Sequence, residues 1–127
     1  MSRIETRSGN VFSAACPSRA VLEQLGEKWA LLILHLLSDG PQRTSDLRRA
    51  IDGVSEKMLI QTLRKLERNG FVERRSYNEV PPRVDYRLTD LGASLSPVVQ
   101  AFDRWIESRI VEVMAAQHRF DARSEDR

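Results

Sequence analysis

The sequence predicts a mainly α-helical domain with one small β-ribbon, and three features support this fold class. First, residues 44–69 read as a helix, a tight turn and a second helix, each with start and stop signals. Second, strand-like segments at 71–77 and 83–88 flank Pro81-Pro82, which belongs in a loop because proline cannot donate to a sheet ladder. Third, apolar residues recur every three or four positions from Thr89 onward, the period of a helix. This order of elements is that of a winged helix-turn-helix.

Length and composition fit one globular domain. The chain has 127 residues, of which 41% are hydrophobic and 30% are charged, ordinary values for a folded domain. The longest apolar run, Trp29–Leu37, is far shorter than the roughly 20 residues that a membrane span requires. The amino terminus shows no signal-peptide pattern and the chain has a single cysteine, so we expect a cytoplasmic protein that does not enter the membrane.

We expect three segments along the chain. Residues 1–15 lack periodicity and predict an amino-terminal arm. Residues 16–118 are expected to form the winged helix-turn-helix domain, which would both bind DNA and dimerise. Residues 119–127 are charged and predict a disordered tail.

Two helices are expected ahead of the helix-turn-helix. Ser18 is the predicted cap of the first helix, and Gly26 is its predicted end. The second runs from Trp29 to about Ser38, before Gly40-Pro41, and it must be central because it is apolar almost all round. The apolar residues of the first helix are Ala20, Val21, Leu22 and Leu25.

The helix-turn-helix carries its own capping signals. Thr44 is expected to cap its first helix, with Asp46 where a negative charge suits the helix dipole. Gly53 lies in the turn, and Ser55 is expected to cap the second helix, which ends at Gly70. The expected buried edge of the first of these helices consists of Leu47, Ala50 and Ile51.

The strand at 83–88 alternates in character. Such a period of two predicts a half-buried strand in which one set of side chains faces the core. The apolar set is Val84, Tyr86 and Leu88, and the charged set is Arg83, Asp85 and Arg87.

The terminal helix is longer and more apolar on one side than a small core can cover. Pro97 is expected to kink or restart it. The surplus apolar surface predicts a homodimer in which this helix packs on a second copy of the chain. The expected dimerisation residues are Val98, Phe102, Trp105, Ile106, Ile110 and Val113.

The second helix of the helix-turn-helix has a polar, basic face. Lys57, Gln61, Arg64 and Arg68 fall within one sector of the helix, opposite Leu59, Leu63 and Leu66. Residues 43–87 carry eleven Lys or Arg against seven Asp or Glu, whereas residues 103–127 carry five against six. Positive charge therefore concentrates where counterion release from double-stranded DNA would be needed.

We expect sequence to be read from the amino-terminal half of this helix. The candidate base-contacting residues are Ser55, Lys57, Gln61 and Arg64. The alternative is that Lys57, Gln61 and Arg64 contact only phosphate or solvent. The candidate backbone or wing contacts are Thr44, Ser45, Arg68, Tyr77, Asn78 and Arg83. Helix capping alone would explain Thr44 and Ser45 equally well, and Arg74, Arg75 and Arg87 are expected only to solvate the ribbon.

Four segments together resemble the HxlR-type winged helix-turn-helix transcriptional regulators, a family related to the MarR group. They are Cys16-Pro17, GEKWALLIL at 26–34, VSEKMLIQTLRKLERNGFVERR at 54–75 and EVPPRVDYRLTDLG at 79–92. The resemblance implies a homodimer joined by its terminal helices, which places two reading helices in successive major grooves of an operator. The sequence departs from the family pattern at Ile60, whose apolar side chain could contact a thymine methyl, and in its extension through Arg127.

The same resemblance makes Cys16 a candidate redox sensor. In some members the cysteine at this position senses oxidants or electrophiles, and the amino end of a helix favours the reactive thiolate. The alternative is a small buried hydrophobe.

Other side chains receive simpler interpretations. Trp29, Phe102 and Trp105 could line a pocket for an apolar effector, but core packing is the preferred interpretation. His35 is expected to be a satisfied core or interface residue, and His118 to lie near the tail. We expect no metal, no cofactor and no enzyme activity, because neither ligand spacing nor a grouping of nucleophile and base is visible. A winged-helix protein-interaction module without DNA specificity is the main alternative function.

Overall fold

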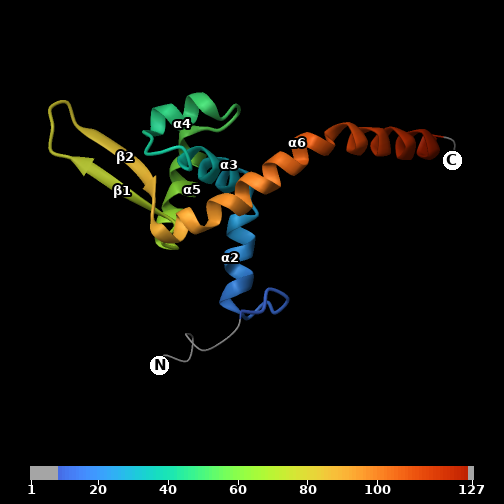
Figure 1. The fold of residues 1–127 in the computed structure, drawn as a ribbon, viewed down its shortest axis with the longest axis horizontal. Coiled ribbons are helices and arrows are strands. Elements are labelled where there is room, and N and C mark those ends of the chain that lie inside the picture. The colour runs from blue at the N-terminus through green and yellow to red at the C-terminus, as the bar shows by residue number, and fades with distance from the viewer. Residues whose placement is uncertain (1–8, 126–127) are drawn as a thin grey trace.

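The structure is a computed structural model that describes residues 9–125. It has the expected mainly helical fold with a two-stranded wing (Figure 1). The helix-turn-helix lies against the ribbon, and a long last helix projects away from both (Figure 1). The elements are α2 (Pro17–Leu25), α3 (Lys28–Leu37), α4 (Thr44–Ala50), α5 (Glu56–Arg68), β1 (Val72–Tyr77), β2 (Arg83–Leu88) and α6 (Asp90–Glu125).

Helix α2 begins one residue before the expected cap. Cys16 occupies the cap position and Pro17 the first turn, so the prediction that Ser18 caps this helix is wrong. The reason is local, because the fixed φ of proline suits the first helical position and its missing N–H costs nothing there. Of the expected arm, residues 1–8 lie outside the described residues. Residues from 9 onward fold back on α2, where the Arg19 guanidinium donates to the Val11 carbonyl at 2.8 Å.

Helix α3 is central, as expected. It packs against α2, α5, α6 and β2, and four of its residues are buried, namely Ala30, Ile33, Leu34 and Leu37. Helix α2 buries none of its own residues, and Ala20 and Leu22, expected as part of its packing face, are exposed.

The helix-turn-helix has the predicted turn and one predicted cap. The Ser55 hydroxyl accepts the Met58 amide at 3.1 Å, and Gly53 in the turn has a φ of 88°, a conformation that favours glycine. Thr44 is instead the first residue of α4, and the Asp46 carboxylate accepts the amide of the preceding Arg43 at 3.0 Å.

The core lies beneath the helix-turn-helix and the ribbon. Leu47 and Ile51 of the expected edge are buried, and Ala50 is exposed. Leu59, Leu63 and Leu66 of α5 are also buried, as the pattern predicted.

The wing is an antiparallel pair whose register joins Val72 to Leu88 and Tyr77 to Arg83. A third segment extends this sheet by one bridge, because Gln42 and Tyr86 exchange both backbone hydrogen bonds at 2.9 Å. The strict alternation expected for β2 fails at Asp85, which is 2% exposed. Two neighbouring arginines cover its carboxylate, so a charged residue is buried on the outer face of the ribbon.

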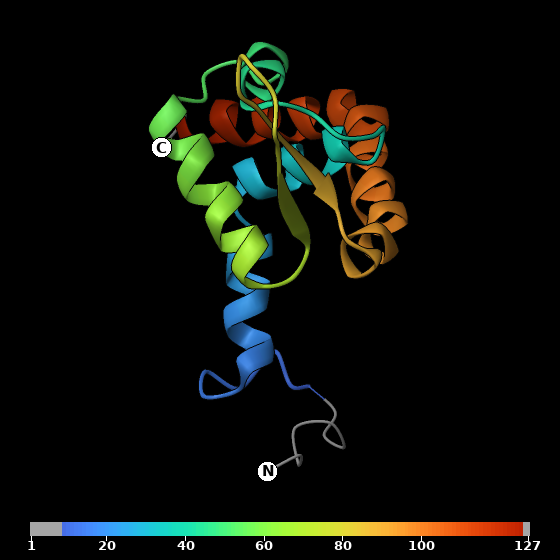
Figure 2. The same cartoon turned by 90° about the vertical axis from the view of Figure 1, so that its left-hand side faces the viewer.

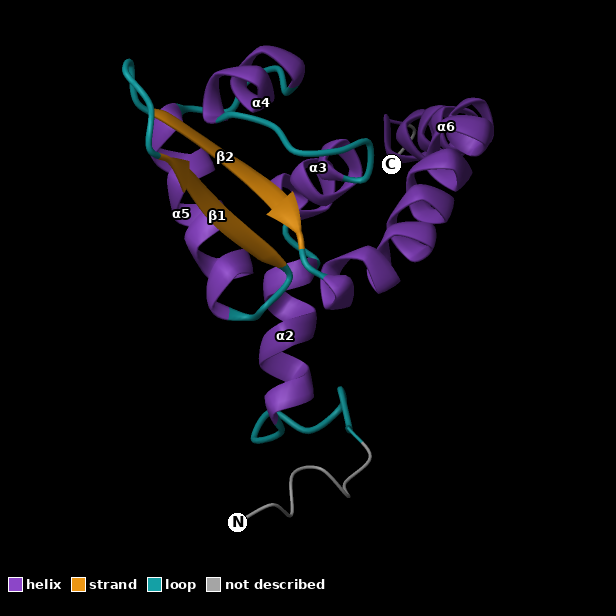
Figure 3. Cartoon of the chain, turned by 60° about the vertical axis from the view of Figure 1, so that its left-hand side comes forward, coloured by secondary structure: helices purple, strands orange, loops and turns teal. Residues whose placement is uncertain are grey.

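Helix α6 is continuous through Pro97 and beyond the expected tail. It does not restart at the proline, although its axis changes direction along its length (Figure 3). The tail expected from residue 119 is helical to Glu125, because residues 115–125 contain no glycine or proline and several strong helix formers. No helix within residues 9–125 combines the length and apolar character needed to cross a membrane.

Candidate nucleic-acid interface

The polar face of α5 is open to solvent. Helix α5 lies on one side of the molecule beside the ribbon, with nothing in front of it (Figure 2). Its amphipathic pattern produces this arrangement, because the leucines opposite are drawn into the core against α3 and α4. The exposed residues include all four of the predicted polar stripe, Lys57, Gln61, Arg64 and Arg68.

The end of α4 contacts the start of α5. The Arg48 guanidinium, in the last turn of α4, lies 3.3 Å from the Glu56 carboxylate in the first turn of α5. Ser55 is exposed, but its hydroxyl accepts the Met58 amide, so its capping role is the one that the structure accounts for. Thr44 is half-buried, and Ser45 is exposed one residue later.

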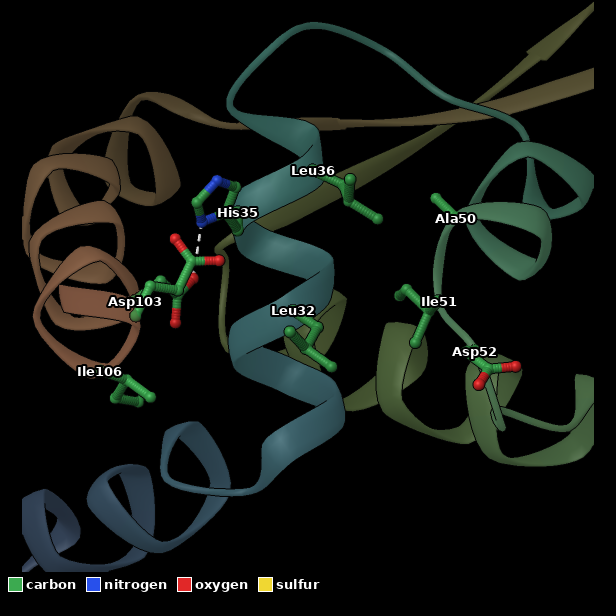
Figure 4. A pocket seen from close by; sticks show the side chains of 9 residues that line it. Leu32, His35, Leu36, Ala50, Ile51, Asp52, Asp103 and Ile106 are labelled. Carbon is green, nitrogen blue, oxygen red and sulfur yellow. Dashed lines mark hydrogen bonds and ion pairs between the residues drawn. The ribbon is translucent and has the colours of Figure 1, made fainter. Parts of the chain in front are cut away.

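A hollow of about 540 Å³ lies on the other side of α3, between α4 and α6 (Figure 4). Its walls are mainly apolar, and Leu32, Ile51 and Ile106 contribute to them. His35 Nδ1 lies 2.6 Å from Asp103 Oδ2 at one edge, and this pair ties α3 to α6 (Figure 4). His35 is thus a satisfied, half-buried residue at a helix interface, as expected.

A second hollow, of about 620 Å³, separates α5 from the ribbon. Arg64 and Arg74 line it from opposite sides, and Thr44 contributes from the start of α4. Ile60, which departs from the family pattern, is half-buried and also lines this hollow. Two arginines and one acidic residue, Glu67, therefore line this hollow beside the polar face of α5.

The predicted wing residues form a packed cluster on the ribbon. The Arg83 guanidinium lies over the Tyr77 ring, 4.5 Å from its centroid, and the Tyr77 hydroxyl accepts from Arg87 at 3.0 Å. The carboxylate of Asp85 lies 3.7 Å from each of these guanidinium groups. Asn78 is exposed in the loop at the end of the ribbon.

The six predicted dimerisation residues are all exposed in the single chain. Within residues 104–124 every side chain of α6 is exposed, and the residues beyond Glu107 do not line the hollow against α3. Phe102 and Trp105 are 49% and 56% exposed, and the preference for core packing is therefore wrong for both. Trp29 is half-buried against the core. The full exposed set is Val98, Phe102, Trp105, Ile106, Ile110 and Val113.

Cys16 is half-buried at the start of α2, and its sulfur accepts the Asn10 amide at 3.4 Å. Within residues 9–125 no three His, Cys, Asp or Glu side chains gather as metal ligands would.

The sequence analysis missed the contacts of three ribbon residues, Arg74, Asp85 and Arg87. Arg74 and Arg87 were expected only to solvate the ribbon, yet one lines the hollow and the other bonds to Tyr77. Asp85 was expected to follow the alternation. Its position between two arginines two residues away on either side, facing one side of a strand, was the available signal.

Comparisons with known proteins agree with this geometry. A model of the HxlR-like helix-turn-helix matches residues 24–114. The chain is 49% identical over 113 residues to YtfH of Escherichia coli, an uncharacterized HTH-type transcriptional regulator, covering 89% of this chain and 90% of that protein.

Solved structures are similar as well. A structure of ytfH from Salmonella typhimurium, assigned as a transcriptional regulator, is 50% identical with a TM-score of 0.82, covering 87% of this chain and 99% of that one. The redox regulator HypR in its oxidized form is 38% identical with a TM-score of 0.68, covering 73% of this chain and 96% of that one.

Proposed function

This chain belongs to the HxlR-like helix-turn-helix family and is a DNA-binding transcriptional regulator, and we propose that it reads a specific duplex site as a homodimer. The observation that carries this proposal is the exposed basic face of α5 beside a wing whose arginines are held in place. A protein-interaction module is expected to expose a neutral or apolar face on this helix, and the stripe of Lys57, Gln61, Arg64 and Arg68 argues against it. We propose regulation without catalysis, in the cytoplasm.

Base contacts come from the amino-terminal half of α5. In helix-turn-helix proteins the residues near the start of the second helix approach base edges in the major groove. Lys57 suits guanine O6 or N7, Gln61 suits the N6 and N7 of adenine, and Arg64 suits either a guanine or a phosphate. All three are exposed. Ser55 lies at the same end, although its bond to the Met58 amide makes it the weakest of the four candidates.

Phosphate contacts flank this helix on both sides. The hollow between α5 and the ribbon carries Arg64 and Arg74, so a DNA strand leaving the major groove would meet two cations there. Arg83 and Tyr77, with Asn78, would meet the next stretch of backbone or the minor groove. The remaining proposed backbone contacts are Thr44, Ser45 and Arg68.

The exposed apolar side chains of α6 support the proposed homodimer. Most helical stability in proteins comes from packing one face, and an unpartnered helix in water is marginal. Residues 104–124 of α6 have exposed apolar side chains and no partner element within the described chain. In the proposed dimer, paired α6 helices bury this surface, and the two α5 helices enter successive major grooves, which are about 34 Å apart in B-DNA.

We propose Cys16 as the sensor of oxidants or electrophiles. It is half-buried, so a reagent has partial access, and the related structure of HypR is of a redox regulator in its oxidized form. One cysteine per chain allows an intersubunit disulfide, a mixed disulfide with a small thiol, or alkylation.

The test is titration of duplex DNA at two salt concentrations. Footprinting of the intergenic region beside the gene identifies the protected duplex, and a shuffled duplex of equal composition serves as the control. We expect tighter binding to the protected duplex and a steep loss of affinity with salt. Equal affinity for both duplexes would overturn sequence-specific reading, and absence of binding to either would favour the protein-interaction alternative.

A further inference from the structure

The outer face of the wing gathers an unusual set of charged side chains. The register places Arg75 opposite Asp85 and Tyr77 opposite Arg83. Side chains two residues apart on a strand share a face, so Arg87 lies on this face too. The same face also carries Glu73, which the register places opposite Arg87. Two of the arginines, Arg83 and Arg87, lie within 4 Å of the Asp85 carboxylate.

The side chain of Asp85 is more deeply buried than those of the neighbouring Arg83 and Arg87. Its side chain is 3% exposed, whereas those of Arg83 and Arg87 are 41% and 27% exposed. Each guanidinium has one nitrogen 3.7 Å from an Asp85 carboxylate oxygen, and the two contacts use different oxygens. One buried carboxylate thus faces both arginines from below, while parts of both guanidinium groups remain open to solvent.

Tyr77 restrains the same two arginines from the side. The Arg83 guanidinium lies 4.5 Å from the centroid of the Tyr77 ring, and the Tyr77 hydroxyl accepts from Arg87 at 3.0 Å. Each arginine therefore has two restraints, one from Asp85 and one from Tyr77. Holding a long side chain in place before binding lowers the conformational entropy lost when it contacts a ligand.

Stability alone is a weak reason for this carboxylate. Burying an ion pair costs desolvation that imperfect contacts do not repay, and apolar residues often replace such pairs without loss. Here the carboxylate oxygen Oδ1 of Asp85 and the Nε atoms of Arg83 and Arg87 are buried without a hydrogen-bond partner in the described chain. Because the Asp85 carboxylate contributes little to stability, its restraint of Arg83 and Arg87 explains its presence better.

We propose that Asp85 is a positioning residue for DNA binding, which holds Arg83 and Arg87 along the wing so that their outer N–H groups meet the phosphate backbone. This inference rests on the proposed function, in which the wing contacts DNA. Asp85 itself touches no phosphate, because its side chain is buried and its charge would repel one. Its contribution passes through the two arginines.

The direction in which one substitution changes the affinity for DNA tests this role. Asp85→Asn keeps the shape of the side chain and removes a negative charge from the wing. If charge alone mattered, affinity for DNA would rise. Positioning predicts the opposite: affinity for the protected intergenic duplex about tenfold weaker, the size of a lost charge-assisted contact, and a salt slope smaller by about one.

Glu79→Gln is the matched control. Glu79 is exposed in the wing loop, so the substitution makes the same change in charge without touching the cluster. Fluorescence anisotropy with the labelled duplex should give equal or tighter binding for this variant. Binding by Asp85→Asn that is as tight as the wild type, or tighter, would overturn the proposal.

A variant with both Arg83→Ala and Arg87→Ala separates positioning from a loss of fold. Positioning predicts that Asp85→Asn causes no further loss of affinity in this background. An equal loss of affinity in both backgrounds would mean that Asp85 acts through the stability of the wing, and the proposal would be overturned. If the double alanine variant binds DNA as tightly as the wild type, the wing does not contact DNA and that part of the proposed function is wrong. If the double alanine variant binds weakly but Asp85→Asn binds normally, only the positioning role of Asp85 is wrong.

Discussion

Gly92 lies so close to the backbone of Phe71 that a Cβ at position 92 would be 2.0 Å from the Phe71 carbonyl oxygen. That carbonyl accepts the Thr89 amide at 3.1 Å, and the Thr89 hydroxyl accepts the Gly92 amide, also at 3.1 Å. The start of α6 is thereby fastened to the chain just ahead of β1. The contact sets the direction of the proposed dimer helix relative to the wing.

We expect Gly92→Ala to destabilise the protein by about 1–3 kcal/mol or more, because the added methyl group meets backbone that cannot rotate away. Thermal or urea unfolding measures the loss. Gly26→Ala is the control: the φ at Gly26 is −75°, which alanine adopts freely, so a change within about 1 kcal/mol is expected there. Equal unfolding midpoints for the wild type and Gly92→Ala would contradict the close contact.

Substitution of Lys57 or Gln61 by alanine should relax sequence discrimination. Each variant is expected to lose about 1–3 kcal/mol at the one or two operator positions that it reads. Binding to a set of duplexes with single base-pair changes measures this loss. Lys65→Ala is the control, since Lys65 is exposed on α5 but lies outside the polar stripe. A uniform loss for every duplex would assign Lys57 and Gln61 to phosphate contact.

Arg83→Ala should weaken all duplexes alike. A phosphate contact carries no sequence information, so its loss is expected to lower the salt slope by about one without changing discrimination. Titrations of the protected and shuffled duplexes across several salt concentrations provide the measurement. An unchanged slope, with the loss confined to the protected duplex, would indicate that Arg83 reads a base.

Ile110→Asp should dissociate the dimer. Ile110 is 43% exposed in the single chain, so the substitution spares the core but buries a charge in the proposed interface, at a cost of several kcal/mol. Sedimentation should show a shift from twice the 14.6 kDa chain mass to that mass. Val111→Asp, at a residue that is 76% exposed and outside the proposed set, should remain dimeric. A wild type that sediments at the chain mass would remove the basis of this prediction.

Treatment with diamide should release the wild type from DNA and leave Cys16→Ser bound. The chain has no other cysteine, so a thiol oxidant has no second target. Binding to the protected duplex before and after treatment, with reversal by a reducing thiol, is the measurement. Release of Cys16→Ser by diamide would exclude the sensing role.

Local signals in the chain were sufficient for the order of elements. Ser55 and Gly53 marked the turn and the start of α5 because capping and positive φ are properties of single residues. The spacing of Leu59, Leu63 and Leu66 assigned the buried face of α5, and hence the exposed basic one, since a helix repeats every 3.6 residues. At the start of α2, two local signals competed, and Pro17 prevailed over Ser18.

Contacts between distant residues required the folded chain. No local pattern pairs Gln42 with Tyr86, because that bridge depends on how α3 and α4 orient the loop between them. The same holds for the 2.6 Å contact of His35 with Asp103, sixty-eight residues apart, and for Arg74, which lines a hollow only once α5 lies beside the ribbon. Asp85 is the clearest case: alternation along a strand tells which face a side chain takes, but its burial there depends on how the long side chains of Arg83 and Arg87 lie over it.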